Sequence, residues 1–328
     1  MQKERGNCLQ SASHSLRLMG ASITLTIFHE NAQELLLQSE QLLHLYKNRF
    51  SANDADSELM EINLQAGKKA VQVHPELFEL IELGKKHSIA ANSHLNIAIG
   101  PLVQTWRIGF SDAKLPSEEE IQRLLKITNP EEIVLNDSNR EVYLSKEGMR
   151  IDLGALAKGY IADKLKEFLV EQGVQSGIID LGGNILTIGE NPTFQRPWRI
   201  GIQNPELSRG EHVAVIAVSD ASVVTSGIYE RYLEVDDKTY HHILNPKTGY
   251  PYENDIAGVS IIVSSSTRGD ALSTSMFSIG VEEGLKYVNQ KDDVDAVFMT
   301  KDKKVYVSNL IKNAFKLTNE QYTWEGTH

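Results

Sequence analysis

Asp270 and Thr274 carry the side chains that point most directly to chemistry. They stand four residues apart in the stretch Asp270-Ala-Leu-Ser-Thr274, so on a helix they would share one face. A carboxylate and a hydroxyl are hard oxygen ligands of the kind that Mg²⁺ takes. The apolar run Ile256–Val263 predicts a buried strand ahead of them, and residues 271–280 predict a helix. Oxygen ligands near a helix N-terminus would suit a metal-bound phosphate.

A second interpretation of the same stretch is purely structural. Thr267-Arg-Gly-Asp270 matches a capping box in which Asp takes the place of Glu. An Asp near a helix N-terminus is also stabilised by the helix dipole without any ligand. The spacing taken alone favours capping over metal binding, so the rest of the chain must decide between them.

Other acids and histidines lie beside predicted strands or turns. The acids in apolar surroundings are Asp152, Asp180 and Asp270, and the histidines are His94, His241 and His242. The chain has no H-E-x-x-H, no G-x-S-x-G and no G-x-G-x-x-G, which argues against a zinc protease, a serine hydrolase of the nucleophile-elbow type and a dinucleotide fingerprint. The oxygen-rich set fits Mg²⁺ and a phosphorylated substrate better.

Length and composition limit the class of protein. The chain has 328 residues, 41% hydrophobic residues and a net charge of −11, which allows a substantial core and makes a nucleic-acid partner unexpected. Apolar runs are too short for membrane insertion. Cys8 is the only cysteine, so it can form no internal disulfide. The N-terminus lacks a hydrophobic signal segment, and we expect a cytoplasmic protein; a removed leader would instead mean export or membrane anchoring.

The elements that must position these residues predict one α+β domain, with mixed or antiparallel sheets flanked by helices. We expect a flexible N-terminus at residues 1–13, the domain at 14–318 and a C-terminal tail at 319–328. Periodicity predicts helices at 31–48, 75–91, 116–127 and 157–172. It predicts strands at 22–28, 177–181, 198–202, 212–218, 222–225, 294–299 and 304–307, and a hairpin from 132–135 and 141–144.

Four separated blocks resemble the ApbE family, the FAD:protein FMN transferases. They are Asn96–Val103 continuing to Trp106, Ile151–Tyr160 (Ile-Asp-Leu-Gly-Ala-Leu-Ala-Lys-Gly-Tyr), Asp180-Leu-Gly-Gly-Asn184, and His242–Pro251 (His-Ile-Leu-Asn-Pro-Lys-Thr-Gly-Tyr-Pro) taken with Asp270–Thr274. Met19-Gly20, Asp56-Ser57 and Thr225-Ser226-Gly227 agree as well. The resemblance spans roughly Leu16 to Gly280 and implies an ApbE-like, T-fold-related architecture.

The resemblance implies a reaction. FAD would bind with Mg²⁺ at its diphosphate, and a Ser or Thr hydroxyl in a target motif of an acceptor flavoprotein would attack the FMN-side phosphorus. FMN would become joined to that side chain, and AMP would leave. With this pattern in place, Mg²⁺ binding becomes the favoured interpretation of Asp270, and Thr267 would keep the capping role.

The family pattern also implies roles for individual residues. The metal ligands would be Asp270 and Thr274 through their side chains and Ala155 through its carbonyl, with Ser273 assisting. The catalytic residues would be Asp270 and His242, the latter as general base; alternatively, His242 only orders its turn. The FAD-binding positions would be Met19, Asn53, His94, Leu95, Asn96, Asp152, Lys158 and Leu244.

Three positions depart from the family pattern. Asn96 and Asn245 stand where Asp is usual, and Leu95 stands where an aromatic residue is usual. Asn keeps an acceptor oxygen and loses the charge, so neither asparagine is counted as a metal ligand. Two alternatives to the transferase stay open: a FAD pyrophosphatase that forms FMN and AMP, and a flavin-binding protein without turnover.

Overall fold

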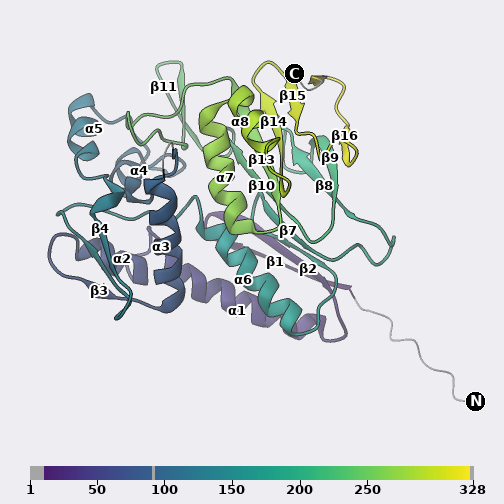
Figure 1. The fold of residues 1–328 in the computed structure, drawn as a ribbon, viewed down its shortest axis with the longest axis horizontal. Coiled ribbons are helices and arrows are strands. Elements are labelled where there is room, and N and C mark those ends of the chain that lie inside the picture. Colours follow the sequence, from purple (N-terminus) through teal and green to yellow (C-terminus); the bar gives the residue numbers. More distant parts are fainter. Residues whose placement is uncertain (1–10, 91–92, 326–328) are drawn as a thin grey trace, which may run out of the picture.

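A nine-stranded sheet runs through the centre of the structure, a computed structural model that describes residues 11–90 and 93–325 (Figure 1). The strand order is β1-β2-β6-β7-β10-β13-β14-β15-β17. Neighbouring strands are antiparallel except for the parallel pair β15 and β17. The strands are β1 (Ser11–Leu18), β2 (Ala21–Phe28), β6 (Gly177–Asp180), β7 (Asn184–Ile188), β10 (Ser222–Gly227), β13 (Ile256–Val263), β14 (Val294–Thr300), β15 (Lys304–Val307) and β17 (Thr323–Glu325).

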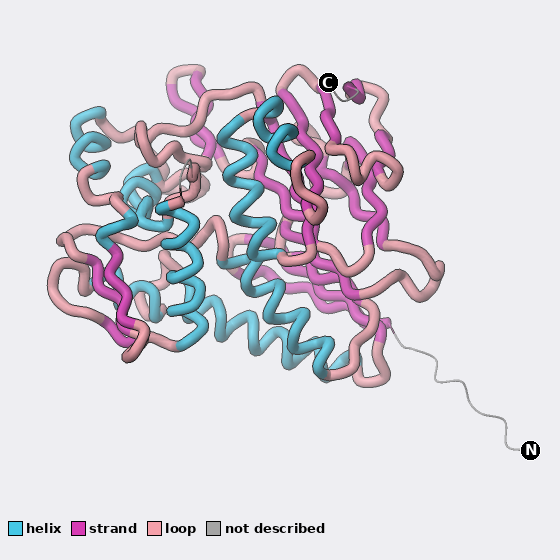
Figure 2. Tube along the Cα trace, in the orientation of Figure 1, coloured by secondary structure: helices cyan, strands magenta, loops and turns pink. Residues whose placement is uncertain are grey.

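Helices cover one face of this sheet and a smaller sheet covers the other (Figure 2). The helices are α1 (Ala32–Phe50), α6 (Ala157–Glu171), α7 (Ser266–Ile279) and α8 (Val281–Val288), and the smaller sheet has the order β16 (Phe315–Leu317), β9 (His212–Val218), β8 (Trp198–Gln203). Val259 and Ile261 of β13 pack with α7 and α8, whereas Ile262 packs with the smaller sheet. All of β13 is therefore buried, as its continuous apolar run predicts.

The remaining elements gather beside the N-terminal half of the large sheet, where Figure 1 shows α2, α3, α4 and α5 in blue. They are α2 (Glu58–Leu64), α3 (Pro75–Ile89), η1 (Ile97–Ile99), α4 (Gly100–Trp106), α5 (Glu118–Leu125), η2 (Pro130–Glu132) and a three-stranded sheet with the order β3 (Val71–Gln72), β5 (Glu141–Leu144), β4 (Ile133–Asn136). The hairpin of β11 (Tyr232–Val235) and β12 (Lys238–His241) projects separately. This arrangement confirms the predicted α+β class with mixed and antiparallel sheets.

The two chain ends differ from the sequence-based expectation. Residues 11–13, predicted to be flexible, belong to β1, whose hydroxyls pair with those of β2 at Ser13–Thr26 and Ser15–Thr24. Alternate positions of β1 face inwards, but only Ala12 is fully buried, while Leu16 and Leu18 pack partly against the main core. The alternation at residues 11–13 is therefore too weak to predict the strand. The predicted tail contains β17, which pairs with β15. Residues 1–10, with Cys8, and residues 326–328 lie outside the described chain.

Helices α6 and α7 cap each other with carboxylates. Asp163 of α6 accepts hydrogen bonds from the backbone N–H groups of Ser266 (2.8 Å) and Thr267 (2.9 Å) at the start of α7. Asp270 of α7 in turn accepts one from the N–H of Gly159 in the first turn of α6, at 2.5 Å. Each carboxylate therefore satisfies N–H groups that a helix start leaves without partners.

The start of α7 corrects the capping-box interpretation. The helix begins at Ser266 rather than at residue 271, and its N-cap is Ser265, whose hydroxyl accepts from the N–H of Arg268. Thr267 therefore lies inside the helix, and its hydroxyl donates to Asp163. Asp270 does not cap its own helix. The capping signal was present, but it belonged to the serine two residues earlier.

Among the residues that the structure describes, no helix combines the length and the apolar content that a bilayer crossing needs.

Replacing Gly159 by Ala should separate α6 from α7. A Cβ there would lie 2.3 Å from the carbonyl oxygen of Ser266, an obstacle in the backbone. We expect Gly159→Ala to lower the free energy of unfolding by about 1–3 kcal/mol, although Ala is the better helix former. Denaturant-induced unfolding followed by circular dichroism measures this. Gly84→Ala is the matched control, since its Cβ would meet only side-chain methyl groups of Ile97 and Leu156. Equal losses in the two variants would contradict the close α6–α7 contact.

Candidate active site

Asp270 is a buried carboxylate with a hydrogen bond on each oxygen. The residue is 6% exposed. Its Oδ2 accepts from the N–H of Gly159, and its Oδ1 accepts from the side-chain amide of Asn184 at 3.1 Å. Burial raises the pKa of Asp270 above its ordinary value, and the Lys158 ammonium and these two hydrogen bonds oppose that rise. Each oxygen keeps a further lone pair, so the carboxylate is oriented and still able to bind a cation.

Asn184 fixes the orientation of that carboxylate. Its side chain is 1% exposed, and its Oδ1 accepts from the hydroxyl of Ser266 at 2.6 Å. The hydroxyl of Ser222 donates to Ser266 at 2.9 Å, so the chain of donors runs in one direction and leaves the NH₂ group for Asp270. The sequence singled out the block that ends in Asn184 but assigned this residue no role. A polar residue directly after a Gly-Gly pair was the available signal.

Two further oxygens beside Asp270 are open. Gly159 donates its N–H to Asp270, and the carbonyl oxygen of Ala155, four residues earlier, receives no hydrogen bond within the described chain. The partly exposed hydroxyl of Thr274 likewise has no hydrogen-bond partner among residues 11–90 and 93–325. Thr274 shares the face of α7 that carries Asp270. One carboxylate, one hydroxyl and one carbonyl form a set of hard oxygen donors that fits Mg²⁺.

Ser273 is occupied differently from Thr274. Its buried hydroxyl donates to the carbonyl oxygen of Asp270 at 3.0 Å and accepts from Ser226 at 2.9 Å. These bonds tie α7 to β10, so Ser273 suits a positioning role better than metal ligation. Within the described residues no three His, Cys, Asp or Glu side chains gather as a metal-binding group. A cation at Asp270 would therefore rely on neutral oxygens and on the substrate for its other ligands.

The two adjacent histidines have different hydrogen-bonding states. In His241, which is 6% exposed, Nε2 meets the carbonyl oxygen of Tyr252 at 2.8 Å and Nδ1 accepts from the N–H of Ile243 at 3.2 Å. Both ring nitrogens of His241 are thus used, and the residue orders the turn. In His242, Nδ1 meets the carbonyl oxygen of Arg231 at 3.2 Å. Because a carbonyl only accepts, Nδ1 carries the proton and Nε2 keeps the lone pair.

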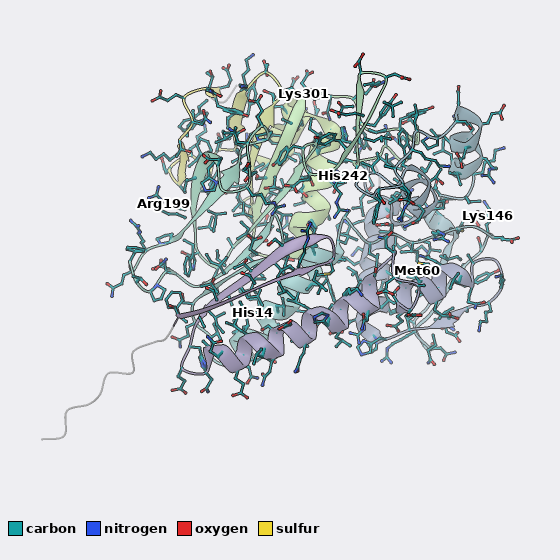
Figure 3. The ribbon with its side chains drawn as sticks, turned by 180° about the vertical axis from the view of Figure 1, so that it is seen from behind. His14, Met60, Lys146, Arg199, His242 and Lys301 are labelled. Atoms are coloured by element: carbon teal, nitrogen blue, oxygen red, sulfur yellow. The ribbon has the colours of Figure 1, made fainter. Side chains whose placement is uncertain are left out.

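His242 is therefore suited to take up a proton. Burial and the nearby Arg231 lower the pKa of His242 to about 4, while the hydrogen bond to the Arg231 carbonyl opposes that decrease. The ring is neutral near pH 7. Lys158 contributes to the positive field on His242 and also acts on Asp270, so the N-terminus of α6 lies within electrostatic reach of both. Seen from behind, His242 lies in the central part of the molecule (Figure 3).

In the segment before η1, most side chains are engaged in packing or hydrogen bonds within the protein. Leu95 is 4% exposed and packs in the main core. Asn96 accepts from the N–H of Ala98 and donates to the carbonyl oxygen of Thr128, both at 2.8 Å. Only His94 reaches across, with Nδ1 at 3.1 Å from the hydroxyl of Tyr252. The structure thus brings His94 to the turn that follows His242, while the side chains of Leu95 and Asn96 are engaged within the fold.

The side chains at three other predicted flavin positions, Met19, Leu244 and Asn53, are already engaged within the protein to different degrees. Met19 lies in the β1–β2 turn with φ of 51° and packs partly on the main core. Leu244 is 7% exposed and packs with Leu102 and Trp106, so any contact with a ligand would come through its backbone. Asn53 accepts side-chain hydrogen bonds from Gln104 and Arg107.

The rigid turn after His242 stabilises itself. The side chain of Asn245 accepts from the N–H of Lys247 at 2.9 Å, and its carbonyl oxygen accepts from Gly249 at 2.8 Å. An acceptor oxygen is all that this turn requires, so Asn serves there as well as Asp. The N–H of Gly249 is thus engaged within the turn and is not free to bind a phosphate.

Asp152 lies in the segment that leads into α6. Its Oδ1 accepts from the N–H of Gly154 at 2.8 Å, and burial raises the pKa of Asp152 while Arg231 opposes the rise. Asp152, Ala155, Lys158 and Asp270 therefore all lie at the N-terminal end of α6.

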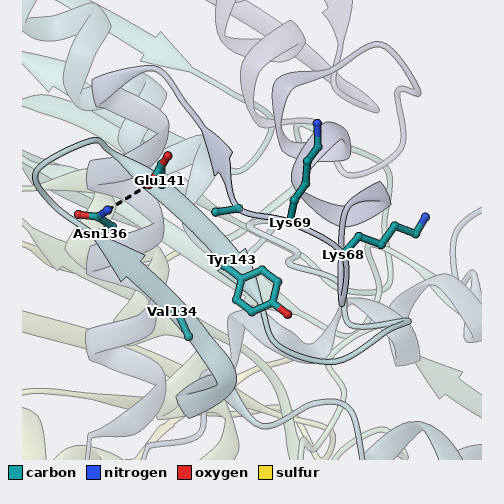
Figure 4. A pocket seen from close by; sticks show the side chains of 7 residues that line it. Lys68, Lys69, Val134, Asn136, Glu141 and Tyr143 are labelled. Atoms are coloured by element: carbon teal, nitrogen blue, oxygen red, sulfur yellow. Dashed lines mark hydrogen bonds between the residues drawn. The ribbon is translucent and has the colours of Figure 1, made fainter.

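The surface hollows lie elsewhere. One of about 370 Å³ is lined by Lys68, Lys69, Val134 and Tyr143 on the three-stranded sheet (Figure 4). Another, of about 340 Å³, includes Tyr229 and Tyr322. Neither contains a predicted site residue. The site is defined by side-chain chemistry and hydrogen bonding, not by the size of a cavity.

The raised pKa of Asp270 predicts a pH dependence of stability in the absence of metal. The folded protein binds this proton more tightly than the unfolded chain, so its contribution to the unfolding free energy rises as pH falls from the raised folded pKa towards 3.8. Subtracting the unfolding free energy of Asp270→Ala from that of the natural protein at each pH isolates the effect. We expect the difference to increase on acidification through that window. A difference that decreases would mean that the carboxylate is stabilised in its charged form.

The chain matches the ApbE family model over residues 19–298. It is 40% identical over 298 residues to a FAD:protein FMN transferase of Klebsiella pneumoniae (strain 342), covering 90% of this chain and 92% of that one. A FAD:protein FMN transferase of Treponema pallidum (strain Nichols) is 35% identical over 308 residues, covering 90% and 83%. The crystal structure of an ApbE protein from Thermotoga maritima superposes with a TM-score of 0.85 at 28% identity, covering 93% and 99%. These matches span the sheet, α6, α7 and the Asp270 site together, and the chain belongs to the ApbE family.

Proposed function

We propose that this protein transfers FMN from FAD to a Ser or Thr hydroxyl of an acceptor flavoprotein. The names of its relatives, FAD:protein FMN transferases, support this reaction. The observation that carries it is the pair of open oxygens, on Thr274 and Ala155, beside a buried and oriented Asp270. A protein that only stores flavin has no need for a desolvated carboxylate of this kind.

The oxygen set at α6 and α7 would hold Mg²⁺ through Asp270, Thr274 and Ala155. Bound there, Mg²⁺ would neutralise charge that develops on the diphosphate oxygens during transfer. Asn184 and Gly159 keep the carboxylate in one orientation. Lys158 adds a positive charge near the same carboxylate, and its ammonium is available to the phosphates.

The transfer itself balances without an oxidant or reductant. The acceptor hydroxyl oxygen forms a bond to the FMN-side phosphorus, and the bond from that phosphorus to the bridging oxygen breaks. AMP leaves with the bridging oxygen. The hydroxyl proton passes to Nε2 of His242, the ring nitrogen whose lone pair is free. The negative charge of bound FAD would raise the pKa of His242, which strengthens the base when substrate is present.

Loss of the Asp270 carboxylate should abolish transfer. We expect Asp270→Ala to show no flavin fluorescence retained on an acceptor peptide after denaturation, with an unchanged circular dichroism spectrum. MgCl₂ should raise the Tm of the natural protein and not that of the variant, because a ligand stabilises only the state that binds it. FMN and AMP released in the natural protein without labelled peptide would indicate hydrolysis instead, and unchanged FAD would indicate binding alone.

Thr274→Val tests the second ligand with a close control. The change removes the hydroxyl at constant shape and should raise the Mg²⁺ concentration needed for half-maximal transfer. Ser278→Ala, one turn further along α7, removes a hydroxyl that donates to the carbonyl oxygen of Thr274 and should leave this concentration unchanged. Equal behaviour of the two variants would contradict the ligand assignment.

His242 should control the acidic side of the pH profile. With saturating Mg²⁺, kcat/KM should decline only as pH falls towards about 4, the pKa of His242 in the ligand-free protein. On acidification kcat should begin to decline at a higher pH than kcat/KM does, because bound FAD raises the pKa of His242. His242→Ala should lose about 10²- to 10⁴-fold in kcat together with this limb. The exposed His44, which pairs with Glu40, is the control position. A full rate in His242→Ala would exclude this base.

A further inference from the structure

Arg231 has a guanidinium without a protein partner. The residue is exposed, and its side chain makes no hydrogen bond or ion pair within the described chain. Arg107, by contrast, pairs with Asp112, and Arg209 pairs with Glu230. The protein has a net charge of −11, so acidic partners are plentiful. The Arg231 guanidinium is therefore open to an anionic ligand.

Two distant turns make room for the Arg231 side chain. A Cβ at Gly109 would lie 2.7 Å from Cδ of Arg231, and a Cβ at Gly20 would lie 3.2 Å from Nη2. Both glycines have positive φ, +90° and +72°, a conformation that other residues rarely adopt. The side chain therefore lies along two backbone turns that approach it closely. The guanidinium therefore lies beside Gly20, the residue that follows Met19.

The same arginine contacts the catalytic turn. Its carbonyl oxygen accepts from the backbone N–H of His242 at 3.2 Å and meets Nδ1 of the same ring at 3.2 Å. Its charge acts on His242 and on Asp152. Arg231 thus lies within electrostatic reach of the candidate base His242 and of the candidate flavin contact Asp152, and its side chain lies beside the turn that contains Met19. Sequence reasoning assigned it no role, since an arginine before a predicted strand has no distinguishing spacing.

We propose that the Arg231 guanidinium binds the diphosphate of FAD and makes the site prefer the dinucleotide over riboflavin. The proposal rests on the proposed FAD reaction and adds a residue that recognises its substrate. A planar guanidinium presents N–H groups in a fork that matches two phosphate oxygens. Placed next to His242, it would hold the reacting phosphorus near the base. Its positive charge would also offset part of the negative charge that bound phosphate brings near His242. It would therefore limit the rise in the pKa of His242.

The test measures binding as well as turnover, with the full chain. FAD and riboflavin are titrated by flavin fluorescence into the natural protein, Arg231→Gln, Arg231→Lys and the control Arg209→Gln. Arg209 is a nearby exposed arginine that is already paired with Glu230. We expect Arg231→Gln to weaken FAD binding by about tenfold to a hundredfold, the range for charge-assisted hydrogen bonds. Riboflavin binding should not change, and Arg231→Lys should lose less.

Salt dependence and kinetics separate this role from a structural one. The dependence of FAD affinity on salt should weaken in Arg231→Gln, because a screened charge contact is removed. KM for FAD should rise more than kcat falls, and the Tm should stay near that of the natural protein. Equal weakening for FAD and riboflavin, or unchanged FAD affinity, would overturn the proposal while leaving the transferase function intact. Failure of the natural protein to bind FAD would overturn the proposed function and this inference together.

Discussion

The mutual capping of α6 and α7 is the interaction on which the site depends. Asp270 accepts from the N-terminus of α6, and Asp163 accepts from the N-terminus of α7. Gly159 allows the helices to approach until its own backbone lies against Ser266. Two helix starts with their positive dipole ends meet two carboxylates. The proposed metal ligands then meet at one junction, with Asp270 on α7 and Ala155 in the turn just before α6.

This junction keeps a charged group where water would normally be required. Burial disfavours the charged form of Asp270, and the N–H of Gly159, the amide of Asn184 and the charge of Lys158 compensate only in part. A cation that approaches the carboxylate would stabilise its charged form further. The chain from Ser222 through Ser266 to Asn184 holds the amide in the orientation that serves Asp270. A buried carboxylate whose pKa desolvation raises is typical of functional sites.

Neighbouring backbone groups set the hydrogen-bonding states of His241 and His242. His241 has both ring nitrogens satisfied, whereas His242 has its Nδ1 proton directed at the Arg231 carbonyl. Two histidines adjacent in sequence therefore differ: both ring nitrogens of His241 are engaged, whereas Nε2 of His242, the proposed base, keeps its lone pair. Arg231 links the two halves of the site, because its backbone orients the base and its side chain lies beside the β1–β2 turn.

The sequence by itself determined the local pattern. The apolar run of β13, the four-residue spacing of Asp270 and Thr274, and the turn chemistry of Asn245 all follow from interactions between near neighbours, which covalent geometry fixes. It misjudged the start of β1, which an antiparallel ladder with β2 holds although its first residues are only weakly apolar, and it placed the start of α7 too late. The tertiary structure alone decided the partners of Asp270, which lie 111 and 86 residues away in the chain. It also decided which ring nitrogen of His242 is free and where Arg231 lies. Those properties depend on close packing between segments distant in sequence, and no local spacing encodes them.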